Sequence, residues 1–377
     1  MILIVFLYSA ISTSSLQFSS PNTIYSPLIN TYYHQYSLNL SIGTPPQSLP
    51  LVLGLQTSWT WMQSSICPCN SKYSPNSSNT HSKTGENLTL YYEIGSIESE
   101  KCIDTLIINN NTLKNFQFLV SFKETKLGSL KSSGVLGLGI QQHPEDFPSI
   151  IEIMNNEGII DQKLFSLFLA PKGDNQESFV TFGGYDEELC KGKELVSIDA
   201  DTQNGFWKVK IDHVEYGGVF YDINPEVLID IGTSMIYVDK RVAKKIKKYL
   251  KSLYKCYSNI DYFCEIPSKD VETLSILSIG LGGYSFNIPA SNYLSCLNIT
   301  CKVQISSLPS NTWILGIPFL LSFYSIYNIQ SSQILFLQPV PLQSSLYPLT
   351  LFCFLSLSFY LLFSYKRKST LFSYQKL

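Results

Sequence analysis

The chain has 377 residues, of which 45% are hydrophobic and 13% aromatic, and its formal net charge is −2. This composition excludes a disordered chain, and the near-zero charge excludes the broad basic field on which nucleic-acid binding depends. The length is sufficient for two ordinary domains with a substantial core. The charges are unevenly placed, since the first basic residue is Lys72 and the first acidic residue is Glu86.

The first residues have the character of a secretory signal. Met1–Ala10 is almost wholly apolar and is followed by small residues, so we expect a signal peptide over residues 1–14, cleaved near Ser12 or Ser14. No Lys or Arg precedes the apolar stretch, which leaves a buried N-terminal strand as the alternative. Residues 15–35 then form a short N-terminal segment.

Most of the chain that follows, to about residue 340, reads as short strands. Runs of β-branched, aliphatic or aromatic residues alternate with turns rich in Gly, Pro, Asn and Ser. The clearest predicted strands are Tyr36–Ile42, Leu49–Leu55, Thr105–Ile108, Phe116–Phe122, Phe179–Phe182 and Phe206–Ile211. We therefore expect an all-β fold with a few short helices.

The clearest helix is predicted over Lys240–Tyr257, where apolar residues recur at helical spacing on one face and lysines occupy another. The apolar face comprises Val242, Ile246, Tyr249, Leu250 and Leu253, and the basic face Lys244, Lys245, Lys247, Lys248 and Lys251. We interpret the lysines as the solvated side of the helix, and the alternative is that they bind anionic lipid.

The chain also contains a long internal repeat. A hydrophobic strand that ends in a Gly/Thr/Ser turn occurs over Leu51–Ser58 and again over Val227–Ser234. Each copy is followed by an apolar-Leu-Gly signature, at Val135–Leu138 and at Trp313–Gly316. Two β-rich lobes that carry equivalent elements are the economical interpretation.

Near the C-terminus, Tyr347–Tyr365 is a run of 19 residues without a charge. At about 1.5 Å per residue, a helix of this length spans roughly 28 Å, close to the hydrocarbon core of a bilayer. The basic cluster Lys366–Lys368 follows, and such clusters stay on the cytoplasmic side. We expect one C-terminal transmembrane helix over 347–365, a cytoplasmic tail over 366–377, and the rest of the chain in a lumen or outside the cell.

The nine cysteines fit an oxidising compartment, because eight of them lie outside the predicted span. These eight are Cys67, Cys69, Cys102, Cys190, Cys256, Cys264, Cys296 and Cys301. The close pair Cys67 and Cys69 suggests a metal site, but no second close pair and no His cluster accompanies it. We therefore predict no metal and no cofactor. Five N-x-S/T sequons agree with secretion as a glycoprotein.

Eight segments in order resemble the pepsin-like aspartic protease family, from about Tyr33 to Pro339. Trp61 stands where the family has a Trp after its first catalytic turn, and Tyr92 stands at the tyrosine of the flap. The full set is Tyr36–Gln47, Trp61, Leu90–Ser96, Leu164–Leu169, Val180–Gly184, Phe206–Val209, Val227–Ser234 and Trp313–Gly316.

The resemblance implies a two-lobed pepsin-like acid protease fold. Its N-terminal lobe, with the flap, covers residues 36–200, and its C-terminal lobe covers residues 201–340. The resemblance also implies a disulfide between Cys264 and Cys301, with Cys256–Cys296 as an added pair, although four cysteines alone allow three pairings. The pairing among the other four cysteines outside the span stays open.

Proteases of this family activate a water between two aspartates, one from each lobe, which share one proton. Asp230 matches the aspartate of the second lobe. In the first-lobe turn, Gly54 stands where the family has Asp, Leu55 where it has Thr, and Gln56 where it has Gly. Because no Asp or Glu precedes Glu86, shifting the alignment within this strand does not supply the carboxylate.

Two further features of the turns agree with this loss. The family braces its two aspartates with a Thr from each turn, and here both positions are aliphatic, at Leu55 and Ile231. Thr57 and Thr233 keep hydroxyls where the family supports its carboxylates. By resemblance, Glu93 on the flap is the nearest other carboxyl. Loose preorganisation lowers catalytic rates strongly, so we expect catalysis by the usual route to be impaired.

Three functions follow as hypotheses. The first is a pseudoprotease whose cleft, with Trp61 and Tyr92 retained, binds a peptide or a protein. The second is an active membrane-anchored aspartic endopeptidase in which Asp230 works with a non-standard partner, and the third is a surface scaffold glycoprotein. Residues 15–35 lack the basic prosegment that would neutralise an active dyad, which agrees with the first.

An error in the sequence at Gly54–Gln56 is a further explanation for the missing aspartate. The expected partners are a peptide or protein ligand and the membrane, with no nucleic acid, and we expect a monomer.

Overall fold

The structure is a computed structural model, and it describes residues 18–31, 35–64, 72–92, 95–127, 130–141, 146–171, 176–258, 262–310, 312–337 and 340–341. Two units are distinguished, Met1–Val340 and Pro341–Leu377. The predicted signal peptide, membrane span and cytoplasmic tail lie outside the described residues, as do Cys67, Cys69 and Glu93. Within the described part of the chain, no helix combines the length and the apolar character that a bilayer crossing needs.

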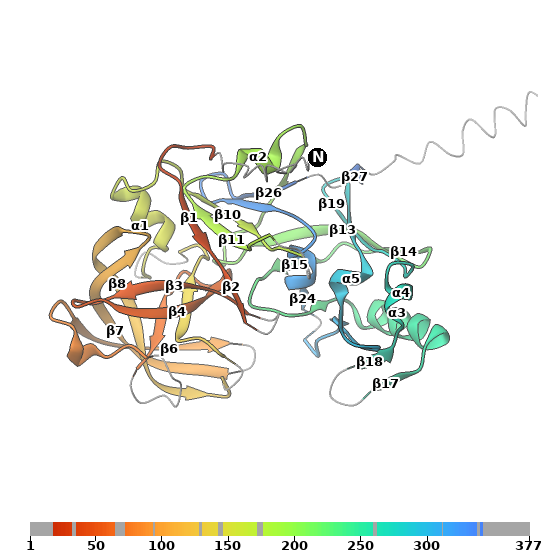
Figure 1. The fold of residues 1–377 in the computed structure, drawn as a ribbon, viewed down its shortest axis with the longest axis horizontal. Coiled ribbons are helices and arrows are strands. Elements are labelled where there is room, and N and C mark those ends of the chain that lie inside the picture. Colours follow the sequence, from red (N-terminus) through yellow and green to blue (C-terminus); the bar gives the residue numbers. More distant parts are fainter. Residues whose placement is uncertain are drawn as a thin grey trace, which may run out of the picture. The chain divides into compact units, whose positions relative to one another are not determined.

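The first half of the described chain forms an eight-stranded sheet (Figure 1). Its strands are β2 (Ile29–Thr31), β3 (Gln35–Ile42), β4 (Gln47–Gly54), β5 (Trp61–Gln63), β6 (Ser82–Tyr92), β7 (Gly95–Ile108), β8 (Asn111–Thr125) and β9 (Gly134–Gly137). They lie in the order β2-β3-β4-β9-β5-β8-β7-β6. Alternation fixes the inner face, as in β7, where Asp104, Leu106 and Ile108 are buried at every second position.

The second half forms a nine-stranded sheet. Its strands are β13 (Lys208–Tyr216), β14 (Val219–Asp222), β15 (Glu226–Ile229), β16 (Ile236–Tyr237), β19 (Leu277–Leu281), β20 (Tyr284–Ile288), β23 (Ile305–Ser306), β24 (Trp313–Leu315) and β27 (Val340–Pro341). The order is β23-β16-β24-β15-β13-β19-β20-β27, and β14 pairs with β13. The two halves thus each build a sheet of their own, as a two-lobed fold requires.

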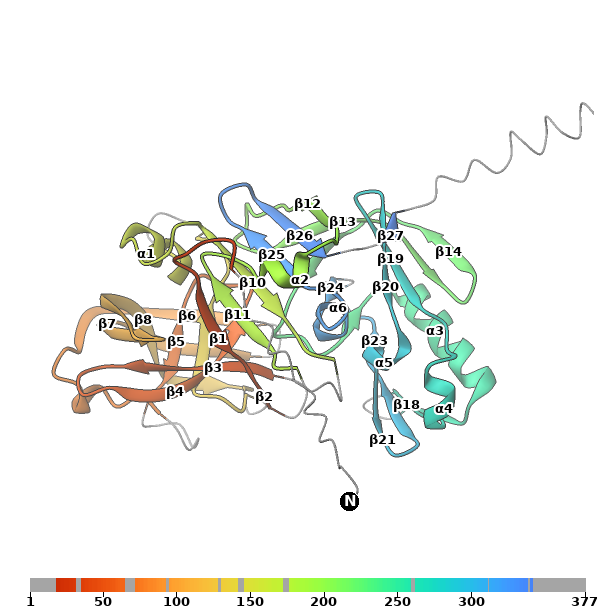
Figure 2. The same cartoon turned by 45° about the horizontal axis from the view of Figure 1, so that its top comes forward.

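A six-stranded sheet joins strands from both halves (Figure 2). It consists of β1 (Ile24–Pro27), β10 (Leu164–Phe168), β11 (Phe179–Phe182), β12 (Leu195–Asp199), β25 (Ser325–Asn328) and β26 (Gln333–Leu337). The order is β1-β11-β10-β25-β26-β12. Phe165 of β10 lies opposite Tyr327 of β25, and their rings stack with centroids 4.6 Å apart. Aromatic packing therefore ties the halves together across this sheet.

The helices are short, apart from one. They are η1 (Pro75–Ser77), α1 (Ile150–Asn156), α2 (Glu187–Cys190), α3 (Lys240–Leu253), α4 (Ser268–Val271), α5 (Ala290–Tyr293) and α6 (Ile317–Leu320). The predicted helix at Lys240 is confirmed, but it ends at Leu253 and not at Tyr257. Tyr254 is extended, and Cys256 already belongs to a strand. Local hydrophobic spacing did not reveal this change from helix to strand.

A four-stranded sheet corrects the predicted disulfides. Its strands are β17 (Cys256–Ser258), β18 (Tyr262–Glu265), β22 (Thr300–Val303) and β21 (Leu294–Leu297), in that order. The bonds are Cys256–Cys264 and Cys296–Cys301, so the predicted bonds Cys264–Cys301 and Cys256–Cys296 are wrong. The four cysteines lie in one row across the sheet, with Cys264 and Cys301 in the middle. Bonding within each hairpin uses all four thiols, whereas a central bond leaves the outer two separated by two strands.

Three of the predicted strands agree with the structure to within two residues, whereas Thr105–Ile108 and Phe116–Phe122 cover only parts of β7 and β8. Phe179–Phe182 coincides with β11, and Tyr36–Ile42 begins one residue after β3 does. The strand predicted over Phe206–Ile211 begins two residues later in the structure and is longer, since β13 extends from Lys208 to Tyr216. The mostly β architecture with few short helices is therefore as predicted from the sequence.

Candidate active site

Two turns occupy equivalent places in the two large sheets. β4 runs parallel to β9, and β15 runs parallel to β24. A third strand completes each group, since β5 lies antiparallel to β9 and β16 lies antiparallel to β24. Gly54 at the end of β4 and Asp230 just after β15 are therefore counterparts, as the internal repeat of the sequence predicts.

Asp230 is held by its own turn. The Gly232 N–H donates to Oδ1 at 3.0 Å, and the Thr233 hydroxyl donates to Oδ2 at 2.6 Å. The residue is 7% exposed. Burial raises the pKa of the Asp230 carboxyl, against the lowering effect of these two hydrogen bonds. Asp230 therefore keeps its proton to a higher pH than an exposed aspartate, and in that form it can donate a hydrogen bond.

Gly54 brings no side chain to the first turn. Its backbone lies opposite Gly137 of β9, and its carbonyl accepts the Leu138 N–H at 2.8 Å. A Cβ placed on Gly54 would lie 2.7 Å from Cγ1 of Val135, well inside the optimal separation of two nonbonded carbons, about 3.5–4.0 Å. Val135 therefore occupies the space into which a side chain at position 54 would project.

The two bracing positions are part of the apolar core. Leu55 is fully buried and Ile231 is 1% exposed, and both belong to the same hydrophobic cluster. Neither side chain can donate a hydrogen bond across the site. In the first turn the Thr57 hydroxyl accepts the N–H of Trp59 at 3.0 Å. Thr57 thus supports its own backbone, whereas Thr233 supports a carboxyl.

Trp61 and Tyr92, which the resemblance places after the first catalytic turn and on the flap, are in contact. The Trp61 indole N–H donates to the Tyr92 hydroxyl at 2.6 Å, and the two ring centroids are 6.3 Å apart. Burial raises the pKa of Tyr92, so its hydroxyl stays neutral. Tyr92 ends β6, and Trp61 begins β5, so this bond fixes the flap strand against the body of the sheet.

The predicted site residues line one open cavity of about 610 Å³. Gly54, Thr57, Trp61, Tyr92, Asp230 and Thr233 all contribute to its wall. Among the described lining residues, Asp230 is the only acidic one and Lys131 the only basic one. The lining also includes the apolar side chains of Leu127, Leu130, Val135 and Ile314. The sequence did not single out Lys131 or Val135 as site residues: no motif surrounds Lys131, and Val135 was noted only as part of the apolar-Leu-Gly signature.

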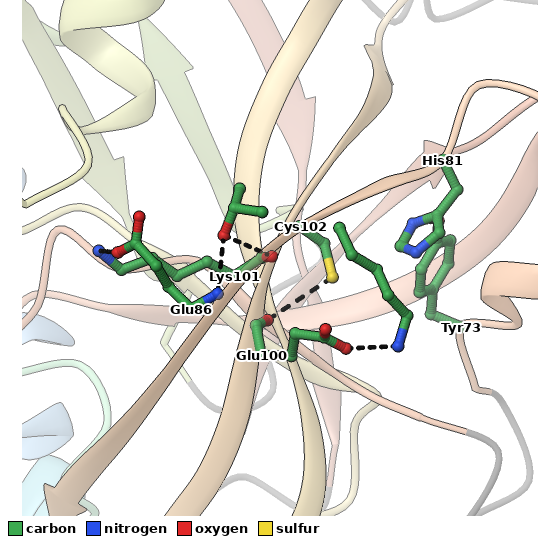
Figure 3. A network of polar contacts seen from close by, with 8 residues as sticks. Tyr73, His81, Glu86, Glu100, Lys101 and Cys102 are labelled. Atoms are coloured by element: carbon green, nitrogen blue, oxygen red, sulfur yellow. Dashed lines mark hydrogen bonds and ion pairs between the residues drawn. The ribbon is translucent and has the colours of Figure 1, made fainter.

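Other carboxyl groups near the flap are engaged elsewhere. Figure 3 shows Glu86 beside Lys101, whose side chains form an ion pair of 2.8 Å. Glu100 pairs with Lys83 at 2.6 Å, next to the buried thiol of Cys102. Neither glutamate lines the cavity. They are therefore not replacements for the carboxyl that Gly54 lacks.

Asp104 on β7 is a buried carboxyl of the first lobe, and it also lies outside the cavity. The hydroxyls of Tyr73 and Thr80 each donate to it at 2.5 Å. Burial by itself would raise the pKa of Asp104, but these hydrogen bonds hold it below its ordinary value. The carboxylate thus joins the segment that contains Tyr73 and Thr80 to β7. The adjacent His81 contacts the Tyr73 hydroxyl at 2.9 Å, and burial lowers the pKa of its imidazole.

No group of three or more His, Cys, Asp or Glu residues suited to a metal ion occurs among the residues with described positions. The thiols of Cys102 and Cys190 are not in disulfides there. Burial raises the pKa of the Cys102 thiol to about 12 and that of Cys190 to about 11. Both thiols are therefore protonated and poorly nucleophilic at neutral pH.

Comparison with known proteins points to one family. The sequence model of the eukaryotic aspartyl proteases matches residues 35–338. Embryonic pepsinogen of Gallus gallus is 27% identical over 321 residues, which is 82% of this chain and 81% of that protein. Pepsin A of Gallus gallus is 27% identical, covering 82% of this chain and 86% of that protein. Gastricsin of Homo sapiens is 26% identical, covering 79% and 80% respectively.

Proposed function

The chain belongs to the pepsin-like family of eukaryotic aspartyl proteases, and on this premise we propose that it is a catalytically impaired member that binds peptide or protein in its cleft. One observation carries the proposal. The cavity keeps the flap contact between Trp61 and Tyr92 and the supported Asp230, but the counterpart of Asp230 is Gly54.

The chemistry of peptide hydrolysis explains why this difference matters. The family mechanism needs one carboxylate to take a proton from water and one carboxylic acid to polarise the scissile carbonyl. Asp230 can serve one of these roles at a time. Its raised pKa favours the protonated form, which donates to a carbonyl but does not activate water. A bound peptide is therefore held and not cleaved.

The open cavity favours peptide binding over a scaffold role. A pure scaffold has no need for an unfilled cleft, whereas here a cavity of about 610 Å³ lies beneath the flap tyrosine. Its walls combine apolar side chains with a few polar groups, which is typical of sites that bind organic ligands. The lining includes the apolar side chains of Leu127 and Leu130 and the polar side chains of Asp230, Thr57 and Thr233.

We further propose that the protein enters the secretory pathway and is held by a single C-terminal span. This part of the proposal rests on the sequence alone, namely the apolar residues 1–14, the uncharged run 347–365 and the basic cluster after it. Extraction of the full chain from cell membranes by carbonate, as opposed to detergent, would contradict an integral span.

A hydrolysis assay tests the loss of catalysis. The full chain is incubated with an acid-denatured protein between about pH 3 and pH 7, where family dyads titrate, and products are read by mass spectrometry. We expect no cleavage above background, and no change in the Asp230→Asn variant. Asp222→Asn, an exposed position on β14, is the matched control. Cleavage that disappears in Asp230→Asn but persists in Asp222→Asn would establish an active endopeptidase with a non-standard partner for Asp230.

A binding assay tests the cleft. The full chain is mixed with a random peptide pool, retained peptides are sequenced, and their affinities are measured by calorimetry. We expect Leu130→Arg, on the cavity wall, to weaken binding at least about tenfold, since it places an unpaired charge against an apolar ligand. Leu297→Arg, at a side chain 80% exposed and outside the cavity lining, should leave binding unchanged. Equal affinities in the two variants, or no retained peptide, would favour the scaffold hypothesis.

A further inference from the structure

The cleft lacks a charge as well as a catalytic group. In the family, two aspartates share one proton and together keep one negative charge at the catalytic turns. Here Gly54 brings no carboxyl, and Asp230 is the only acidic residue among the described lining residues. Burial raises the pKa of Asp230, so this carboxyl stays neutral to a higher pH than an exposed one. An incoming ligand therefore meets less negative charge than the family mechanism places there.

A lysine lies on the wall of the same cavity. Lys131 is the only basic residue among the described lining residues, and it closely follows the lining residues Leu127 and Leu130 along the chain. Lys131 is exposed, and a lysine carries its ammonium group at the end of a flexible four-carbon stem. Its charge is therefore accessible to a ligand that enters the cavity.

The main chain at Lys131 is fixed. Gln35, which begins β3 and also lines the cavity, accepts the Lys131 N–H through its Oε1 at 2.9 Å. The next residue, Ser132, is buried, and its hydroxyl donates to the carbonyl of Gly134 at 2.9 Å. These hydrogen bonds hold the backbone of the lysine at the cavity wall, so its charge belongs to the built cleft and not to a remote surface.

The described carboxylates of the same lobe do not neutralise Lys131. Glu98 pairs with Lys123. Glu124 accepts a hydrogen bond from the Gln63 amide at 3.0 Å, and the other acidic groups near the flap are engaged as given above. No ion pair of the described structure includes Lys131. A carboxylate that a ligand brings into the cavity can therefore pair with it.

The charges of the cavity distinguish ligands of opposite sign. The described lining has one positive charge, and it has a negative charge only when Asp230 is ionised. Complementary charges favour association, and like charges oppose it. Lys131 therefore repels a cationic ligand and attracts a carboxylate. Because Leu127 and Leu130 lie close to Lys131 in the chain and line the same cavity, an apolar group beside that carboxylate has apolar surface to contact.

We propose that the cleft prefers peptides in which an acidic side chain stands beside an apolar one, and that Lys131 sets this preference. The inference rests on the proposed peptide binding and names the class of ligand. Lys131 acts by a charge-assisted hydrogen bond to the carboxylate of the ligand. The glycine at position 54 then has two consequences, because it removes a catalytic group and also a charge that would repel such a ligand.

A peptide pool tests the preference. The full chain is incubated at about pH 6, where peptide carboxylates are ionised, with random peptides that contain Asp, Glu, Asn and Gln at equal frequency and no Lys or Arg. Retained peptides are sequenced. We expect Asp and Glu together to be enriched at least about threefold over Asn and Gln, which is within the range of exposed ion pairs. In about 1 M salt, where the Debye length is about 3 Å, the enrichment should fall.

Three single substitutions locate the charge that is responsible. Lys131→Gln should still retain peptides, but without the enrichment of acidic residues. Lys126→Gln removes the same charge from an exposed position outside the cavity lining and should keep the enrichment. Glu93 lies outside the described residues, and Glu93→Gln should not lower the enrichment because it removes a negative charge.

Position 54 provides an independent test. Gly54→Asp and Gly54→Asn are compared in a background that carries Val135→Ala and Asp230→Asn, so that space is made for the side chain and no pair of aspartates forms. The two side chains have nearly the same shape, and only the aspartate is charged. We expect Gly54→Asn to keep the enrichment of acidic peptides and Gly54→Asp to lose it.

The outcomes separate this inference from the proposed function. If the wild type retains peptides without enrichment of Asp and Glu, the charge preference is overturned while peptide binding stands. Enrichment that persists in Lys131→Gln, or that is equally lost in Lys126→Gln, overturns the role of Lys131. If the wild type retains no peptide, both the inference and the proposed binding function are overturned.

Discussion

The turns at Gly54 and Asp230 occupy equivalent places in two sheets of the same design, but only the second turn carries a carboxyl. The second turn presents a carboxyl that accepts hydrogen bonds from Gly232 and Thr233. The first turn presents a glycine whose side-chain space is limited by Val135, and its Thr57 binds only backbone. The strand pairings that hold the two turns are nevertheless the same in kind.

The difference shows that the fold and the reaction rest on separate interactions in this family. β4 and β15 are held by parallel pairing and by buried residues such as Leu53 and Ile229, and neither interaction involves a catalytic carboxyl. Buried ionisable groups generally lower stability and are retained for function. The first lobe therefore folds without a carboxyl at position 54.

Restoring the first turn is the largest change that the comparison predicts. The triple variant Gly54→Asp, Leu55→Thr, Gln56→Gly returns a second carboxyl and one brace, and it is made in a Val135→Ala background, which removes the side chain that a Cβ at position 54 would meet. A second acid–base group contributes about 10²–10⁴-fold to such reactions, so we expect cleavage of a denatured protein to rise at least about 100-fold above wild type. The same triple variant with Asp230→Asn is the control and should stay inactive. A folded triple variant without cleavage would show that more than the first turn has been lost.

Packing at Gly54 gives the next largest effect. Gly54→Ala places a Cβ 2.7 Å from Val135 Cγ1, and such overpacking lowers the free energy of unfolding by about 1–3 kcal/mol. In a Val135→Ala background the same substitution should be better tolerated by about 1 kcal/mol. Urea unfolding of the four proteins in this cycle measures the coupling. Strict additivity of the two substitutions would mean that Val135 does not close the site.

The residues that surround Asp230 are adjacent in the chain, so one sequence motif identifies them together. Asp230, Gly232 and Thr233 form one short motif, and the contacts within it follow from the motif itself. The family resemblance placed Trp61 after the first turn and Tyr92 on the flap, but it did not predict the hydrogen bond between them. The limit that Val135 sets on side-chain space at Gly54 was not predicted. It depends on the parallel pairing of β4 with β9, which lies about 80 residues further along the chain.

The disulfides show the same limit. Their cysteines were identified correctly as bonded, but the partner of each depends on which strands are neighbours. Cys264 lies between Cys256 and Cys301 in the sheet, so both were geometrically available. Spacing along the chain does not decide between them. The end of α3 escaped prediction for a related reason, because the apolar spacing continues into β17.

Asp230 itself should show its environment in the pH dependence of stability. Its pKa is raised in the folded state, so the stabilisation from its proton is fully present below the ordinary aspartate pKa of about 3.9 and is lost as pH rises through the folded value. Asp230→Asn stays neutral throughout. We expect the variant to gain stability relative to wild type as pH rises from about 3 to 7, by roughly 1–3 kcal/mol. Urea unfolding at several pH values measures this difference. Asp222→Asn is the control, and its stability relative to wild type should not change with pH. A constant difference between Asp230→Asn and wild type would mean that the carboxyl is not buried.

The two threonines offer the smallest and most direct comparison of the turns. The Thr233 hydroxyl lowers the pKa of Asp230, so Thr233→Val should raise that pKa further and increase the penalty at neutral pH. We expect Thr233→Val to lower the free energy of unfolding by about 1 kcal/mol more at pH 7 than at pH 3. Thr57→Val removes a bond to the neutral N–H of Trp59, and its cost, about 1 kcal/mol, should be the same at both pH values. Because the two substitutions are chemically identical and the turns are equivalent in backbone, any difference in pH dependence reports the carboxyl alone. A parallel pH dependence in Thr57→Val would reveal an ionisable group beside the first turn and would reopen the case for catalysis.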